Sequence, residues 1–230
     1  MAMNRARVPE RFMRLSAVLV VLLSLPVLGS AQTGQSPEAL AKALQARYQS
    51  VRDFTADFVQ IYRGGVLRTE TRESGTVAVK KPGRMRWTYT SPERKEFVSD
   101  GLKMYAYIPE DKQVTVSNVP ADSEAPTPVL FLAGKGDLVK DFRAEKAESP
   151  VQGAIALKLT PRRSEPEYEY LIVALDPGTL QIRALTTKDR QGGESTLRFE
   201  NLKENKGISD KDFAFRIPRG VDVITNGQRN

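Results

Sequence analysis

Alternation of apolar and polar residues with a period of two runs through most of the chain and restricts it to a β-sheet fold. In the segment 84–89, Met85, Trp87 and Tyr89 alternate with polar residues, so one face of an extended strand is apolar. Turn signals such as Pro82-Gly83 and Asp100-Gly101 separate such segments at short intervals. About eleven segments of this kind, the last at 213–217, predict a mainly β protein built on one large antiparallel sheet or barrel.

Two helical segments are predicted to cover this sheet. The run Ser36-Pro37-Glu38 has the residues of a helix start. Apolar side chains then recur on one helix face, at Leu40, Leu44, Tyr48 and Val51. Residues 120–136 contain three prolines, which oppose strand pairing, and an apolar run that predicts a short helix from Pro128. Both helices are expected to bury their apolar faces against other parts of the protein.

The hairpin at Asp100-Gly101 predicts a register for its two strands. A two-residue loop places Ser99 opposite Leu102, Phe97 opposite Met104 and Glu96 opposite Tyr105. Directly opposed residues point to the same side of a sheet. The apolar face is therefore expected to hold Phe97, Leu102, Met104 and Ala106, and the other face Tyr105 and Tyr107.

The chain contains no histidine and no cysteine among its 230 residues. This composition excludes a Ser-His-Asp triad, a thiolate nucleophile, a zinc–cysteine site, a histidine-ligated metal and any disulfide. Carboxylate or lysine chemistry remains, or no chemistry at all. Composition alone leaves this choice open.

The first 31 residues are typical of a cleaved secretory signal peptide. Four arginines within the first 14 residues precede the uncharged run 15–28, and Gly29-Ser30-Ala31 supplies the small residues of a cleavage site. The run is shorter than the roughly 20 residues that span a bilayer, and Pro26 interrupts it. We expect cleavage after Ala31, export, and a single domain over residues 32–230 whose net charge is +4 instead of the full chain's +7.

Aromatic and methionine side chains form a stripe on one face of the predicted sheet. Its members are Phe58, Met85, Trp87, Phe97 and Met104. Such stripes are usually core. A sheet of this size that curls on itself, however, encloses more space than its own side chains readily fill. The stripe is consistent with a filled core and with an apolar hollow for a lipid-like ligand.

The order of several short segments resembles the LolA family of periplasmic outer-membrane lipoprotein carriers. After the first helix come FTADF at 54–58, VKKPGRMRW at 79–87, VSDG at 98–101, TPVLFL at 127–132 and LTP at 159–161. The resemblance implies an incomplete antiparallel β-barrel covered by helices. It also implies an apolar hollow that shelters the acyl chains of lipoproteins between an inner-membrane ABC transporter and an outer-membrane receptor. Such a carrier needs no catalytic residue, so on this interpretation we expect a monomer with no catalytic residues, no metal site and no cofactor.

The resemblance further implies roles for particular residues. Lys81, directly before Pro82, would latch a lid helix by bonding to its backbone carbonyls. Lysine stands here where arginine is common in the family, and it is a point donor without the planar fork of arginine. The inner face of the lid would consist of Val129, Phe131 and Leu132, and the five stripe residues would line the hollow.

Other function classes are consistent with the sequence. The related receptor LolB is itself a lipoprotein and needs a cysteine after its signal peptide, which favours the soluble carrier for this cysteine-free chain. An enzyme with paired carboxylates such as Asp57 and Glu96 is one alternative. A lipoprotein-sensing or lipid-sensing regulatory module of related fold is the other. Arg84 and Arg86 are candidates for the surface that meets the transporter.

Overall fold

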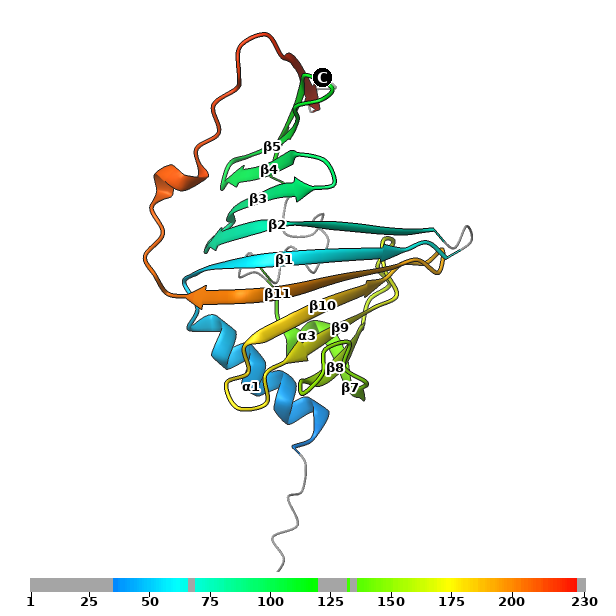
Figure 1. The fold of residues 1–230 in the computed structure, drawn as a ribbon. Coiled ribbons are helices and arrows are strands. Elements are labelled where there is room, and N and C mark those ends of the chain that lie inside the picture. Colours follow the sequence, from blue (N-terminus) through cyan, green and yellow to red (C-terminus); the bar gives the residue numbers. More distant parts are fainter. Residues whose placement is uncertain (1–34, 66–68, 120–131, 133–135, 227–230) are drawn as a thin grey trace, which may run out of the picture. The chain divides into compact units, whose positions relative to one another are not determined.

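The computed structural model describes residues 35–65, 69–119, 132 and 136–226, and the strands among them form one open sheet (Figure 1). The twelve strands follow the order β12-β6-β5-β4-β3-β2-β1-β11-β10-β9-β8-β7, with β12 and β7 at the two edges. Their bounds are β1 (Asp53–Arg63), β2 (Glu70–Lys80), β3 (Arg84–Ser91), β4 (Lys95–Asp100), β5 (Lys103–Ile108), β6 (Gln113–Asn118), β7 (Phe142–Ala147), β8 (Ile155–Pro161), β9 (Tyr170–Leu175), β10 (Ile182–Lys188), β11 (Glu194–Glu204) and β12 (Asp222–Asn226). The predicted antiparallel sheet, curled but not closed, is confirmed.

The N-terminal helix α1 (Pro37–Gln49) begins where the sequence predicts. The Ser36 side chain accepts a hydrogen bond from the Ala39 N–H, and Pro37 occupies the first helical turn, where its missing N–H costs nothing. The predicted apolar stripe of this helix is buried, including Leu44 and Tyr48. A short helix, α3 (Leu138–Asp141), is capped by Asp137 and contacts α1. We call the face of the sheet that carries α1 the inner face.

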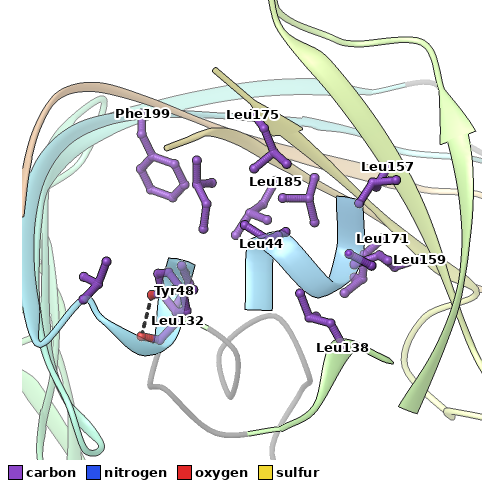
Figure 2. Packing of buried hydrophobic residues seen from close by; sticks show 14 of the residues in the cluster. Leu44, Tyr48, Leu132, Leu138, Leu157, Leu159, Leu171, Leu175, Leu185 and Phe199 are labelled. Carbon is purple, nitrogen blue, oxygen red and sulfur yellow. Dashed lines mark hydrogen bonds between the residues drawn. The ribbon is translucent and has the colours of Figure 1, made fainter. Parts of the chain in front are cut away.

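The main core lies between α1 and the inner face of the sheet. Figure 2 shows Leu44 and Tyr48 of α1 among side chains of β8 to β11, which include Leu157, Leu159, Leu171, Leu175, Leu185 and Phe199. Period-two alternation explains this arrangement, because each strand sends every second side chain toward the helix.

The β4–β5 hairpin departs from the predicted register by two residues. Ser99 lies opposite Met104 and Phe97 opposite Ala106, so the predicted pairing of Phe97 with Met104 is wrong. The loop is longer than two residues because the Asp100 carboxylate accepts hydrogen bonds from the Leu102 and Lys103 N–H groups. A slip of two preserves the face of each side chain. Leu102, however, moves into the loop, where it is 80% exposed.

The C-terminal segment differs from the prediction of a strand at 213–217. A short 3-10 helix, η1 (Asp210–Phe213), ends where the strand was predicted to begin, and residues 214–217 form no strand. The last strand is β12, which pairs parallel to β6. Phe213 is fully buried, and Phe215 stacks on Tyr105 with ring centroids 5.1 Å apart. The segment therefore covers the outer face of β3 to β5. Its sequence resembles that of a strand because it buries apolar side chains against this outer face.

Candidate functional site

Strand pairing places the predicted stripe on one face of neighbouring strands. Met85 lies opposite Ser99, and Trp87 lies opposite both Val77 of β2 and Phe97 of β4. Because directly opposed residues share a face, these side chains point to the inner face together with Met104, which lies opposite Ser99. The stripe is thus continuous across β3, β4 and β5.

A hollow of about 260 Å³ opens over this stripe. Its lining is mostly apolar and consists of Gln60, Met85, Trp87, Tyr89, Phe97, Val98, Ser99, Met104 and Leu197. Trp87, Phe97 and Met104 are only half-buried, although they point to the inner face. A filled core would bury them fully, so the structure favours a hollow at this end of the inner face.

Phe58 is the one stripe residue that does not border the hollow. It is 2% exposed and packs edge-on against Trp87 and Tyr89, with ring centroids 5.1 Å and 4.9 Å away. Phe58 therefore supports the aromatic side chains that form the wall. The other four residues of the stripe, Met85, Trp87, Phe97 and Met104, border the hollow.

Lys81 lies where β2 ends, beside the C-terminal end of α1. Its ammonium group donates a hydrogen bond to the Tyr48 carbonyl and lies 3.5 Å from the centroid of the Tyr48 ring. Burial lowers the pKa of Lys81 to about 8, and the nearby Arg47 lowers it too, whereas Glu204 opposes the shift. Lys81 thus holds the end of α1 through charge-assisted contacts with one tyrosine.

The Tyr48 hydroxyl contacts Leu132, a residue of the predicted lid segment. It donates a buried hydrogen bond of 3.0 Å to the Leu132 carbonyl, drawn as a dashed line in Figure 2. Burial, with Glu204, raises the pKa of Tyr48, so the hydroxyl remains a donor. Leu132 itself is 2% exposed. The other predicted lid residues, Val129 and Phe131, lie outside the described residues, as does the predicted signal peptide 1–31.

The outer face carries a second, polar depression of about 330 Å³. Its lining includes Asp57, Thr76, Thr88 and Arg86. The candidate carboxylates Asp57 and Glu96 lie in one cross-strand row with Thr76 and Thr88 between them. Three strand spacings separate them by about 14 Å, whereas paired catalytic carboxylates lie within roughly 5–9.5 Å. The paired-carboxylate interpretation is therefore wrong for these two residues.

Arg84 and Arg86, the candidates for a transporter surface, contact the chain's own C-terminal segment. Arg86 forms an ion pair with Glu96 and donates to the carbonyls of Asp212 and Ala214. Arg84 lies 3.6 Å from the Asp210 carboxylate. Their described partners show that they anchor η1 and the residues after it.

The sequence did not predict two polar features, one in α1 and one on the inner face of the sheet. Tyr48 was predicted only as part of an apolar stripe, and its hydroxyl contact joins positions 84 residues apart. Gln60, Tyr89 and Lys95 bring polar atoms to one end of the hollow. Period-two alternation alone places these three side chains on the inner face, and no other feature of the sequence predicts their position.

Within the described ranges no cluster of three or more acidic side chains suits a metal ion. No helix in the same ranges is both long and apolar enough to cross a membrane.

An open antiparallel sheet that carries a helix and an apolar hollow on the same face defines a β-sheet protein of the ligand-sheltering kind. The family model described as outer membrane lipoprotein carrier protein LolA matches residues 49–216, which is more than half of the chain. The protein therefore belongs to the LolA family.

Individual relatives agree with this assignment. The outer-membrane lipoprotein carrier protein of Chromohalobacter salexigens is 33% identical over 208 residues, covering 89% of this chain and 93% of the relative. The protein of the same name from Bordetella avium is 32% identical, with 92% and 96% covered. Among solved structures, an uncharacterized conserved protein from Thermus thermophilus has a TM-score of 0.52 at 13% identity, covering 81% of this chain and 99% of that one, which is a likeness of fold alone.

Proposed function

We propose that this protein carries lipoproteins through the periplasm by sheltering their acyl chains in the hollow over Trp87. It takes them from an inner-membrane ABC transporter and delivers them to an outer-membrane receptor. In this proposal the carrier itself is exported and loses its own signal peptide, residues 1–31. The half-buried apolar stripe around the hollow carries this proposal. Each CH₂ group that leaves water for such a site gains about 0.8 kcal/mol. Transfer by relative affinity needs no catalytic residue and no cofactor.

The size of the hollow supports a role for Leu132 in ligand entry. About 260 Å³ is less than the roughly 300–1,000 Å³ of common ligand pockets. Leu132 packs beside Tyr48, Phe54 and Phe199, around a remaining space of only about 10 Å³. Release of Leu132 would therefore extend the apolar surface along β1 and β11. In this proposal Lys81 and Tyr48 act together as the latch, with Lys81 holding Tyr48 and Tyr48 holding Leu132.

Release of a lipoprotein from spheroplasts tests the carrier function. The chain 32–230 is expected to release an inner-membrane lipoprotein into a soluble one-to-one complex. A Trp87→Asp variant, with a charge in the hollow, is expected to lose this activity. The matched variant Leu102→Asp, in an exposed loop, should retain it. Equal activity of both variants, or no release by the wild-type protein, would overturn the proposal.

A Tyr48→Phe variant is expected to loosen Leu132. The substitution removes the donor to the Leu132 carbonyl, and a lost buried hydrogen bond costs about 1 kcal/mol, equivalent to about fivefold in an opening equilibrium. Uptake of the hydrophobic dye N-phenylnaphthylamine should accelerate by about that factor. Tyr62→Phe, at a 36% exposed tyrosine of β1, is the control. Unchanged uptake by Tyr48→Phe would contradict the latch.

Lys81 is expected to lose its proton near pH 8. Its pKa in the folded protein is about 8, below the ordinary value of 10.5, so between these values the unfolded chain binds more protons. The free energy of unfolding, relative to a Lys81→Met variant, should therefore rise as pH increases through this window. Glu204→Gln should lower the pKa of Lys81 further, because Glu204 favours the charged form. NMR titration of the lysine and urea unfolding at about pH 7 and about pH 10, on the two sides of this window, check both outcomes.

A further inference from the structure

The hollow changes from apolar to polar along β3 and β4. Three successive cross-strand pairs point to the inner face, namely Met85–Ser99, Trp87–Phe97 and Tyr89–Lys95. Pairs on one face follow each other at about 6.7 Å along a strand. An acyl chain extended along the strands over Trp87 and Phe97 would have the Tyr89–Lys95 pair at one end and the Met85–Ser99 pair at the other. Its head group would fit the more polar end, at Tyr89 and Lys95.

Five polar side chains from five strands form a connected belt at this end, which we call the polar belt. The Tyr89 hydroxyl donates to Gln60 Oε1 at 2.8 Å, and Gln60 Nε2 donates to Ser195 Oγ at 3.2 Å. Lys95 forms an ion pair with Glu73, and its ammonium group lies 4.5 Å from the centroid of the Tyr89 ring. Gln60 and Tyr89 both line the hollow, so the belt adjoins the space that the ligand would occupy.

The Lys95–Glu73 ion pair beside the hollow is not explained by its contribution to stability. The side chains of Lys95 and Glu73 are 24% and 25% exposed, and the cost of removing such charges from water offsets much of their attraction. Apolar residues would extend the hollow at lower cost. Lysine offers three N–H donors, of which Glu73 accepts one. Because the Lys95 side chain is 24% exposed, its remaining donors can reach solvent or the acceptor oxygens of a ligand.

The charge of the belt indicates which head group fits. Lys95 and Glu73 neutralise each other, so an anionic carboxylate would meet the negative charge of Glu73 as well as the lysine. An uncharged ester carbonyl accepts hydrogen bonds without that repulsion. Burial and the nearby Glu73 raise the pKa of Tyr89 to about 12, so its hydroxyl stays a donor at physiological pH.

We propose that the polar belt recognises the ester carbonyl oxygens of an acylglycerol head group, with Lys95 as the principal donor. The proposal rests on the carrier function, because it assumes that the acyl chain occupies the hollow. It adds that the protein selects for the ester linkage as well as for chain length. Lys95 is thus a specificity-determining residue.

Two probes with the same alkyl length test the proposal on the chain 32–230. They are 1-monopalmitoylglycerol, which has the ester carbonyl, and 1-O-hexadecylglycerol, which has an ether instead. Trp87 is the only tryptophan of the chain and lines the hollow, so its emission reports binding of both. The ester is expected to bind about tenfold more tightly, since a hydrogen bond to a charged donor contributes about 1.5 kcal/mol.

Variants separate recognition from a structural role. Lys95→Met should bring the ester-to-ether ratio close to one, and Lys95→Arg should preserve the preference. Lys103→Met, at an exposed lysine of β5, should change nothing. Equal affinities of the wild-type protein for ester and ether would overturn the proposal while leaving the carrier function intact. If neither probe changed the Trp87 emission, the carrier function would fail as well.

Discussion

A Gly75→Ala variant is expected to lose about 3 kcal/mol of its free energy of unfolding. The added methyl group would clash with backbone atoms of the neighbouring strand, and only a movement of that strand could relieve the clash. A Cβ atom at Gly75 would lie 2.0 Å from the Thr88 carbonyl oxygen and 2.9 Å from the Tyr89 Cα. Both contacts are with the backbone of β3, so β2 and β3 would have to separate. Urea unfolding measures the loss.

The position of Gly75 also links this stability to the hollow. Gly75 lies opposite Phe58 in β1 and opposite Tyr89 in β3. The rings of Phe58 and Tyr89 meet edge-on with centroids 4.9 Å apart, and a side chain on the strand between them would intrude there. The Trp87 emission of the variant should therefore change together with its stability.

Gly178→Ala is the matched control for this substitution. The nearest atom to its added Cβ is 3.6 Å away, an ordinary contact. Its free energy of unfolding should stay within about 0.5 kcal/mol of the wild-type value. Similar stabilities of the two alanine variants would contradict the packing described around Gly75.

A Phe58→Ala variant is expected to lose about 3–5 kcal/mol, the usual cost of truncating a buried phenylalanine. Phe58 is 2% exposed and contacts both Trp87 and Tyr89 edge-on. Each such aromatic contact contributes about 0.5–1.5 kcal/mol beyond the buried area. The vacated volume adjoins the wall of the hollow, so the folded variant should offer the dye N-phenylnaphthylamine a larger binding space. Its Trp87 emission should change because Trp87 loses its contact with the Phe58 ring.

Two further variants calibrate this result. Phe58→Leu retains much of the volume but not the ring, and it should lose a smaller free energy of unfolding than Phe58→Ala. Tyr62→Ala, at the 36% exposed aromatic residue of the same strand, should change stability little. If Phe58→Ala were no less stable than Tyr62→Ala, Phe58 would not support the wall as the structure indicates.

Much of the inner face is predictable from the sequence because period two assigns each side chain to a side of the sheet. Met85, Trp87, Phe97 and Met104 all border the hollow, although the predicted β4–β5 register was wrong by two residues. A slip of two moves a strand along its neighbour without turning its side chains over. The same local pattern predicts the start of α1, since helix caps depend on residues close in sequence.

Contacts between segments distant in the sequence cannot be predicted from such local patterns. The strand at 213–217 was predicted from apolar residues, but Phe213 and Phe215 pack on the outer face from a 3-10 helix and its continuation. Alternation indicates that a side chain becomes buried and does not identify the partner that buries it. For the same reason Asp57 and Glu96 resembled a pair in the sequence, while two strands separate them in the sheet.

The sequence by itself determined the β-sheet architecture, the N-terminal helix, the apolar inner face and the resemblance that the family match bears out, because these follow from local periodicity and from the order of short motifs. Only the tertiary structure decided that the Tyr48 hydroxyl meets Leu132, that Lys95 and Glu73 close a polar belt beside the hollow, and that the C-terminal segment covers the outer face. These contacts depend on which distant strands become neighbours, and β1 pairs with β11 more than a hundred residues away. Such pairing depends on the free energy of the whole sheet and not on any one segment of it.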